Sequence, residues 1–362
     1  MTRVLVVDDS ALMRKFLARL FQAEGGFEVA TARDGSEALA LIGAFRPDVV
    51  TLDVEMPKMD GLACLDRIMV EHPCPVVMVS ALTEHGADET LEALEMGAVD
   101  FVAKPDGTIS LHAEAFAPVI LERVRLAAGI RIPSTTRLAD RLRFRAGTSV
   151  DRRSAPSRAK RLLEMPPALG DETIVLVGAS TGGPPALDTV LSALPAEFGW
   201  PILIAQHMPQ TFTASFARRL DGLCDLSVVE VGKPMPIEPF HVYIGRGDAD
   251  MLVAQRGGRL MVLPAPASPD YRWHPSVDRL VRSAMQHCSP SELLGILMTG
   301  MGNDGAAAMT DLRAAGGHTV AEAEESAVVW GMPGDLVRRG GASDVVPLLQ
   351  IADRLLELGP WR

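Results

Sequence analysis

Three side chains in the second half of the chain have the chemical types that a serine hydrolase needs. Ser180 lies between Gly178 and Gly182 in a G-x-S-x-G pattern, directly after an apolar run that predicts a strand. His207 and Asp304 also follow predicted strands, at residues 202–205 and 294–298. The carboxyl ends of parallel strands open at one edge of a sheet. We therefore expect a nucleophile, a general base and an orienting carboxylate to meet there.

The G-x-S-x-G pattern by itself is also compatible with other sites. A glycine-rich turn after a strand begins dinucleotide-binding domains as well, but the next strand here ends in Gln206 and His207, not in the acid that holds a ribose. The chain order Ser–His–Asp disfavours a plain α/β-hydrolase, whose order is Ser–Asp–His. In the simplest alternative, His207 is a core histidine and Asp304 only caps the helix predicted at 305–315.

Five polar side chains in the first half form a second group. Asp8 and Asp9 follow the first predicted strand, Asp53 ends the third, Ser80 the fourth and Lys104 the fifth. Three crowded carboxylates repel one another unless a hard cation lies among them, and oxygen ligands suit Mg²⁺. Asp53, the central acid, is then the expected nucleophile toward a phosphoryl group, with Lys104 and Ser80 contacting the phosphoryl oxygens. The alternative is that all five are ordinary polar ends of strands.

Apolar runs and helical patterns alternate through the first 128 residues. The expected strands are 4–7, 27–32, 49–52, 76–79 and 99–102, and helical patterns include 11–23 and 36–45. Five strand–helix repeats of this length predict a parallel sheet with helices on both faces.

A second α/β region begins near residue 173. Its expected strands are 174–177, 202–205, 228–231, 242–244, 294–298 and 318–321, and its expected helices are 184–194, 211–223, 276–287, 305–315 and 348–358. Residues 251–262, with Gly257-Gly258 near their middle, predict a hairpin. The fold class is thus α/β throughout, with a doubly wound, mostly parallel second domain that carries a small β-hairpin.

The segment between these regions has a different composition. Residues 129–172 hold ten Lys/Arg against five Asp/Glu, with four prolines, in a chain whose net charge is −11. We expect domains at 1–127 and 171–362 joined by a linker at 128–170, with a helical turn at 136–145. The prolines and the frequent Ser and Thr favour a solvated linker, whereas the basic charge is compatible with the alternative, an element that docks on an acidic surface.

The overall composition narrows the class of protein. The acidic net charge argues against a nucleic-acid-binding output. Four scattered cysteines are typical of reduced thiols in a cytoplasmic protein. No signal peptide is apparent, and no apolar run approaches the roughly 20 residues that cross a bilayer. We expect a cytoplasmic protein without membrane insertion.

The group of five polar residues in the first half of the chain resembles the site of the receiver domain of bacterial response regulators. The resemblance rests on Asp8-Asp9, the segment 53–61, Ser80-Ala81 and Lys104-Pro105, and spans roughly residues 2–125. It implies a flavodoxin-like, five-stranded parallel fold in which Asp53 takes a phosphoryl group from a histidine kinase. It also implies that the backbone carbonyl of Glu55 completes a Mg²⁺ site with Asp9 and Asp53, and that Phe101 occupies the aromatic switch position.

The segments around Ser180, His207 and Asp304 resemble the catalytic domain of the chemotaxis protein-glutamate methylesterases. The segments that carry it are 178–184, 206–209, 274–278, 299–306 and 329–333. The resemblance implies hydrolysis of methyl esters on glutamates in the cytoplasmic helices of chemoreceptors, with release of methanol, and deamidation of selected receptor glutamines. It further implies that Thr181 and Met301 help to position the tetrahedral intermediate, and that the hydrolase site needs no cofactor.

The order of the domains suggests a form of regulation. We expect the unphosphorylated receiver to cover the cleft at Ser180, and a phosphoryl group on Asp53 to shift the interface and expose it. Two other outputs remain open: a noncatalytic nucleotide-binding domain, and an adaptor that passes the phosphorylation signal to a partner complex.

Overall fold

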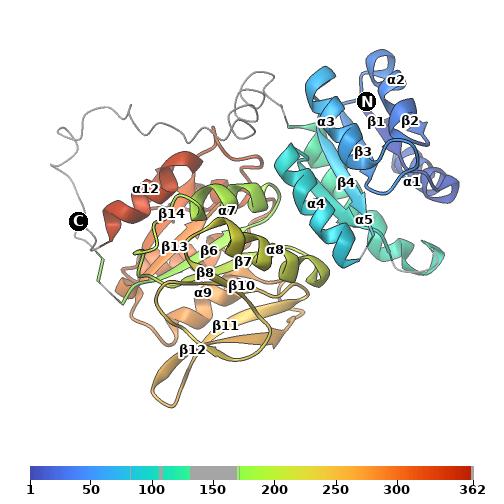
Figure 1. Ribbon diagram of the computed structural model, residues 1–362. Helices are drawn as coiled ribbons and strands as arrows, with labels where there is room; N and C mark the ends of the chain where they lie inside the picture. Colours follow the sequence, from blue (N-terminus) through green and yellow to red (C-terminus); the bar gives the residue numbers. More distant parts are fainter. Residues whose placement is uncertain (82, 106–108, 131–168, 171, 360–362) are drawn as a thin grey trace.

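The computed structural model describes residues 1–81, 83–105, 109–130, 169–170 and 172–359 (Figure 1). Most of the linker expected at 128–170, including the helical turn expected at 136–145, lies outside the described residues. Two separate parallel sheets account for the two α/β regions. None of the helices in the described part of the chain is both long and apolar enough to span a bilayer.

The first sheet has five parallel strands in the order β2-β1-β3-β4-β5. The strands are β1 (Thr2–Val7), β2 (Phe27–Ala32), β3 (Val49–Asp53), β4 (Val76–Ser80) and β5 (Asp100–Ala103). The helices are α1 (Ala11–Glu24), α2 (Gly35–Phe45), α3 (Gly61–Glu71), α4 (Glu84–Met96) and α5 (Ile109–Ala128). Every residue of β3 and β4 is buried, as expected when helices cover both faces of a sheet. The expected five-stranded parallel sheet of the first domain is confirmed.

The second sheet has seven strands in the order β15-β14-β13-β6-β7-β10-β8, all parallel. The strands are β6 (Ile174–Ala179), β7 (Ile202–Gln206), β8 (Ser227–Val231), β10 (His241–Gly245), β13 (Leu293–Leu297), β14 (His318–Glu322) and β15 (Asp344–Val346). The chain builds outward from β6 in one direction and then returns to β13 on its other side. The point where the order reverses therefore lies between β6 and β13, where ligands of open α/β sheets usually bind.

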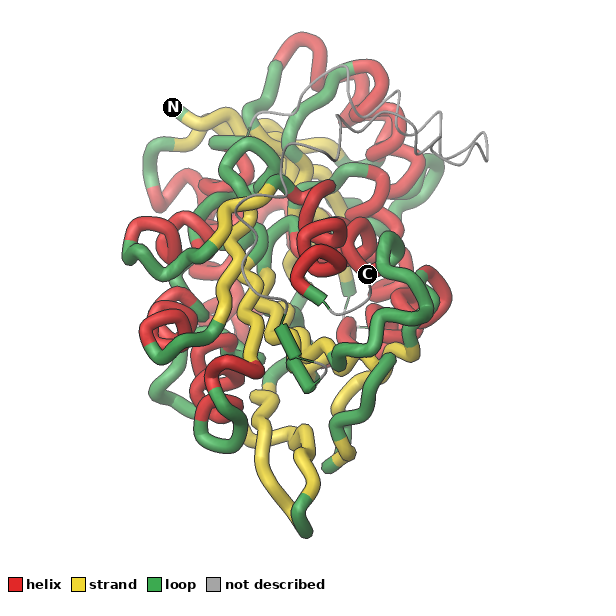
Figure 2. Tube along the Cα trace, turned by 90° about the vertical axis from the view of Figure 1, so that its left-hand side faces the viewer, coloured by secondary structure: helices red, strands yellow, loops and turns green. Residues whose placement is uncertain are grey.

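Helices cover both faces of this sheet, with strands through the centre of the molecule (Figure 2). On one face pack α7 (Gly183–Leu191), α8 (Gln210–Leu223) and α12 (Leu348–Leu358). On the other pack α9 (Val277–Met285), α10 (Ala306–Ala314) and α11 (Met332–Arg338). Alternate residues of β6 feed the two cores, with Val175 and Val177 on one side and Leu176 on the other. The doubly wound fold predicted from the sequence is thus confirmed.

A small antiparallel sheet projects from one end of the second domain (Figures 1 and 2). It contains β11 (Ala249–Arg256), β12 (Arg259–Pro266) and the two-residue β9 (Met235–Pro236). Gly257 and Gly258 form its turn, both with positive φ, as the hairpin prediction required. The short elements β9, β15 and α11 were not predicted, because two to seven residues are too few for a periodic pattern.

The two α/β units pack against each other through α4 and the end of β5 (Figure 1). The ring of Phe101, in β5, lies 4.5 Å from that of Phe212, in α8, measured between centroids. Arg219 of α8 forms an ion pair with Glu95 of α4. The contact therefore combines a buried aromatic pair with charges at its rim.

Candidate functional site

Ser180 follows directly on β6, in the turn that leads into α7. Gly182 makes this turn possible, since its φ is +75° and a Cβ there would lie 2.7 Å from the Val328 side chain. The backbone N–H of Ser180 donates to the carbonyl of Thr299 at 3.0 Å. Gly300 lies immediately behind, where a Cβ would come within 2.8 Å of Ser180 Cβ. The turn and the loop after β13 together fix the serine.

His207 follows β7, the strand next to β6. The side-chain amide of Gln206 donates to the carbonyls of Ser180, at 2.9 Å, and His207, at 3.1 Å. The backbone N–H of His207 donates to the carbonyl of Ala179 at 3.0 Å. Gln206 is buried and thus ties the candidate nucleophile and base to each other.

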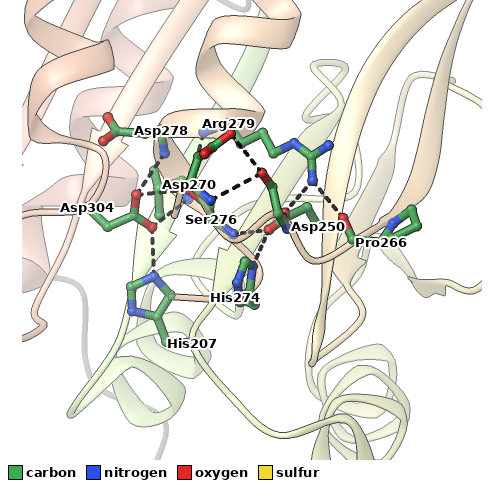
Figure 3. Close-up of polar contacts among 11 residues, drawn as sticks. His207, Asp250, Pro266, Asp270, His274, Ser276, Asp278, Arg279 and Asp304 are labelled. Carbon is green, nitrogen blue, oxygen red and sulfur yellow. Dashed lines mark hydrogen bonds and ion pairs between the residues drawn. The ribbon is translucent and has the colours of Figure 1, made fainter. Parts of the chain in front are cut away.

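Asp304 lies in the loop after β13 and contacts the imidazole (Figure 3). Its Oδ2 is 2.9 Å from His207 Nε2 and accepts a hydrogen bond from the N–H of Val277 at 2.7 Å. Its Oδ1 accepts from the hydroxyl of Ser276 at 3.0 Å and from the N–H of Asp278 at 3.1 Å. The first turn of α9 and its cap therefore hold a carboxylate that in turn holds the histidine.

These donors keep Asp304 ionised although it is buried. Burial is the largest single influence and would raise the pKa of this carboxyl, but the hydrogen bonds from His207, Val277 and Asp278 outweigh it and lower the pKa. Asp304 does not cap the following helix, since the N-cap of α10 is Gly305 and no side chain caps it. The alternative in which Asp304 is only a helix cap is wrong.

The candidate nucleophile and base each keep one polar atom without a hydrogen bond to the described part of the chain. Ser180 Oγ and His207 Nδ1 are both buried and have no partner among the described residues. Because Asp304 takes Nε2, the nitrogen left to accept a proton is Nδ1. The arrangement provides a hydroxyl, a free imidazole nitrogen and a carboxylate on the far side of the ring, the parts of an acyl-transfer site.

A second carboxylate, that of Asp250, holds the start of α9 (Figure 3). Asp250, fully buried in β11, accepts from the N–H of Ser276 at 2.7 Å and from Arg279 at 2.5 Å. His274 Nδ1 lies 2.9 Å from the same carboxylate. Ser276 itself caps α9 by accepting from the N–H of Arg279, as its sequence position predicted.

Thr181 and Met301, predicted to position the intermediate, flank the serine. Met301 is buried in the loop after β13. The hydroxyl of Thr181 lies 2.5 Å from a carboxylate oxygen of Asp100 and accepts a hydrogen bond from Arg123 at 2.5 Å. Asp100 and Arg123 belong to β5 and α5, so the receiver contacts the residue next to the candidate nucleophile.

A cavity of about 460 Å³ lies between the two units. It is lined by Ser180 and His207 from one unit and by Phe101, Lys104 and other residues of β5 and α5 from the other. Ser180 is only 2% exposed and His207 7%. In this arrangement the receiver covers the hydroxyl that a substrate would have to reach.

The receiver site also brings its predicted residues together. Single carboxylate oxygens of Asp8, Asp9 and Asp53 lie within 4.8 Å of one another. Lys104 Nζ is 2.7 Å from Asp53 Oδ2 and 3.0 Å from Asp8 Oδ2. Burial raises the pKa of Asp53 to about 6, against the opposing effect of Lys104 and with a further contribution from Asp8. A cluster of three acids fits Mg²⁺ well.

Ser80, Phe101 and Glu55 differ in how they lie around this site. The Ser80 hydroxyl donates to the carbonyl of Gly86 at 3.1 Å. The Phe101 ring packs against the Phe212 ring of the catalytic unit and is not one of the ligands around Asp53. The Glu55 side chain is exposed, and the role of its backbone carbonyl as a ligand stays a prediction.

Comparison with known proteins connects both sites to families. The receiver domain of response regulators matches residues 4–115, and the CheB methylesterase family matches residues 175–355. A protein-glutamate methylesterase/protein-glutamine glutaminase 2 from Rhodopseudomonas palustris (strain BisB18) is 56% identical over 99% of this chain and 98% of its own. The chain belongs to the CheB methylesterase family. Both resemblances noted in the sequence are confirmed.

Other members of the CheB methylesterase family agree. A protein-glutamate methylesterase/protein-glutamine glutaminase 3 from Rhodospirillum rubrum is 52% identical over 98% of this chain and 95% of its own. The crystal structure of the Thermotoga maritima CheB methylesterase catalytic domain matches with 34% identity and a TM-score of 0.50, over 51% of this chain and 98% of that one. The second domain therefore has the fold of this family.

Several residues that support the site were not found by sequence reasoning. Glu322, at the end of β14, accepts from the N–H of Thr299 at 2.7 Å and so holds the loop behind Ser180. It follows the same strand-end rule that found Asp304, which could have identified it. Asp250 carries no such signal, because an acid in a hairpin strand reads as a solvent-facing residue.

Proposed function

We propose that the chain hydrolyses methyl esters of glutamate side chains in chemoreceptors, releasing methanol, and deamidates selected receptor glutamines. Ser180, His207 and Asp304 carry the reaction, and phosphorylation of Asp53 controls it in chemotaxis signalling. The observation that carries this proposal is the His207–Asp304 pair, which leaves Nδ1 free, together with a buried, unpaired Ser180 hydroxyl in the lining of the same cavity.

Acyl transfer follows from this geometry. Ser180 Oγ attacks the side-chain ester carbonyl while its proton passes to His207 Nδ1, and Asp304 stabilises the imidazolium through Nε2–H. The carbon–oxygen bond to the methoxy group then breaks, and methanol leaves with the proton from His207. Water, deprotonated by the same nitrogen, attacks the acyl-serine and releases the glutamate carboxylate.

The tetrahedral intermediate needs hydrogen-bond donors for its oxygen. Thr181 and the loop at Met301 flank Ser180, and α7 begins at Gly183 with its N-terminal end toward the same turn. Pro184 and Pro185 in its first turn carry no N–H, so this helix end favours negative charge through its dipole and not through donated hydrogen bonds. We assign the positioning of the intermediate to Thr181 and Met301.

The two leaving groups make different demands on His207. Methoxide leaves an ester with little help, whereas ammonia leaves an amide only after His207 has protonated it. Deamidation is therefore the slower of the two reactions unless the glutamine is well placed.

The proposed control of this reaction starts in the receiver. A histidine kinase supplies the phosphoryl group to Asp53. Asp9, Asp53 and the carbonyl of Glu55 would hold Mg²⁺, which would supply positive charge to neutralise the transferring oxygens. Lys104 and Ser80 contact the phosphoryl group. Phe101 links this site to the catalytic unit through Phe212, so a change near Asp53 can shift the cover over Ser180. The proposed substrate, chemoreceptor helices on the cytoplasmic side, places the protein in the cytoplasm.

Methanol release from radiolabelled, methylated receptor membranes tests the proposal. Wild type and Ser180→Ala are compared with and without acetyl phosphate and Mg²⁺. Release that requires Ser180 and increases with the phosphodonor is the expected result. No release by wild type under any condition, from receptors known to be methylated, would instead favour an adaptor or a nucleotide-binding output.

A further inference from the structure

Arg272 and Trp273 lie beside the catalytic base but take no part in the mechanism above. The Trp273 ring is parallel to the His207 imidazole, with an interplanar angle of 6° and centroids 6.0 Å apart. Gly302, with φ of +79°, admits the ring, since a Cβ there would lie 2.6 Å from it. Trp273 is therefore fixed between the loop after β13 and the imidazole.

The guanidinium group of Arg272 lies over the Trp273 ring. Its guanidinium carbon is 5.0 Å from the centroid of Trp273, within the range of a cation–π contact. The Arg272 side chain is 66% exposed. A planar guanidinium held on an aromatic face is preorganised to take a carboxylate with two hydrogen bonds. The site thus places one exposed positive charge next to the candidate base.

The carboxylate that Arg272 contacts comes from the receiver. One guanidinium nitrogen lies 3.2 Å from both Oε1 and Oε2 of Glu122, in α5. Glu122 is also well exposed, and exposed ion pairs stabilise a structure little. The buried contacts of Thr181 with Asp100 and Arg123 are better suited to hold the closed arrangement. The contact between Arg272 and Glu122 therefore adds little to the stability of the closed arrangement, and this points to another role for Arg272.

We propose that Arg272, supported by Trp273, binds an acidic side chain of the substrate protein, and that Glu122 occupies this position while the receiver is closed. The inference rests on the proposed function, because each turnover leaves a new carboxylate on the substrate surface. A glutamate one helical turn from the ester is displaced by about 5.4 Å along the axis, and long side chains can span the remainder. Glu122 itself shows that the position accepts a carboxylate from a helix.

Exchanging the charges of Arg272 and Glu122 distinguishes an effect on substrate binding from an effect on the closed arrangement of the receiver. Full-length Arg272→Glu, Glu122→Arg and the double variant are assayed on methylated receptor membranes and on p-nitrophenyl acetate, a small neutral ester, with and without acetyl phosphate and Mg²⁺. Arg259→Glu, at the exposed turn of the projecting hairpin, is the matched charge control. Thermal melting curves establish that each variant is folded.

Arg272→Glu is expected to raise the KM for receptor about tenfold relative to the KM for the small ester. The double variant is expected to restore low activity without phosphodonor but not the receptor KM, because the substrate still meets a glutamate. An unchanged receptor KM in Arg272→Glu, or full recovery in the double variant, would overturn the inference. Absence of methanol release by wild type would instead overturn the proposed function.

Discussion

The hydroxyl of Ser276 lies 3.0 Å from Oδ1 of Asp304, whose other oxygen contacts the imidazole of His207. Ser276 also caps α9, and the N–H groups of Val277 and Asp278 donate to the same carboxylate. A helix N-terminus therefore fixes the orienting acid, and that acid fixes which nitrogen of the histidine faces the chemistry.

Ser276→Ala removes one donor from Asp304 and weakens the cap of α9. We expect kcat to fall about tenfold. Ser276→Thr keeps a hydroxyl and should retain most of the rate. An equal rate loss in Ser276→Ala and Ser276→Thr would indicate only a structural defect.

Asp53→Asn is expected to stabilise the protein near neutral pH in the absence of Mg²⁺. Burial raises the pKa of Asp53 to about 6 in the folded state, above the ordinary value near 3.9. The protonated carboxyl therefore supports folding fully below about pH 4, and this contribution is lost as the pH rises through about 6.

Thermal unfolding of wild type and Asp53→Asn at pH 4 and pH 8 measures this effect. The variant should gain on the order of 2 kcal/mol at pH 8 and close to none at pH 4. Mg²⁺ should raise the melting temperature of wild type more than that of the variant. A pH-independent difference between the two proteins would contradict the assignment.

Phe101→Ala should increase methanol release in the absence of a phosphodonor. It removes a buried ring that lies 4.5 Å from Phe212 across the domain contact. Loss of such a pair costs on the order of 1 kcal/mol beyond area burial, enough to open the interface several-fold more often.

Phe212→Ala should have a similar effect, and the double variant little more than either single one, because both remove the same contact. Phe16→Ala, which breaks the Phe16–Phe116 pair inside the receiver, serves as the control. Unstimulated activity equal to wild type in both single variants would show that this aromatic pair does not hold the cover.

Gly300→Ala tests the packing behind the nucleophile. The new Cβ would lie 2.4 Å from Met332 Sδ and 2.8 Å from Ser180 Cβ, so the serine has to move. Displacement of about 1 Å can cost on the order of 100-fold in rate, so kcat should fall by about that factor. Gly222→Ala, at an open position in α8, should leave kcat unchanged. Full activity of Gly300→Ala would contradict the fixed position of Ser180.

Most of the fold could be predicted because the strands are buried on both faces. Continuous apolar runs such as 174–177 and 202–205 are typical of strands that are buried on both faces. The polar residues after them mark the edge of the sheet at which the strands end. This rule found Ser180, His207 and Asp304, and in the receiver Asp8, Asp9, Asp53, Ser80 and Lys104. The structure adds that β13, β6 and β7 are adjacent, which brings the first three together.

The contacts between the two units could not be predicted from the sequence in this way. Asp100 looked like one polar residue in a short strand, and Glu122 and Arg123 like ordinary charges on an exposed helix face. A period of 3.6 residues shows which face of a helix is polar, but it does not show what that face meets. Which imidazole nitrogen Asp304 takes likewise depends on where α9 begins in space.

The central claim is that Ser180 is the nucleophile and that the receiver covers it. The most direct test is the rate at which a serine-directed fluorophosphonate labels the full-length protein, with the site located by mass spectrometry, in the presence and absence of acetyl phosphate and Mg²⁺. We predict labelling at Ser180 that is several-fold faster with the phosphodonor, and no such increase in Asp53→Asn. Labelling at another residue, or an equal rate at Ser180 under both conditions, would contradict the account.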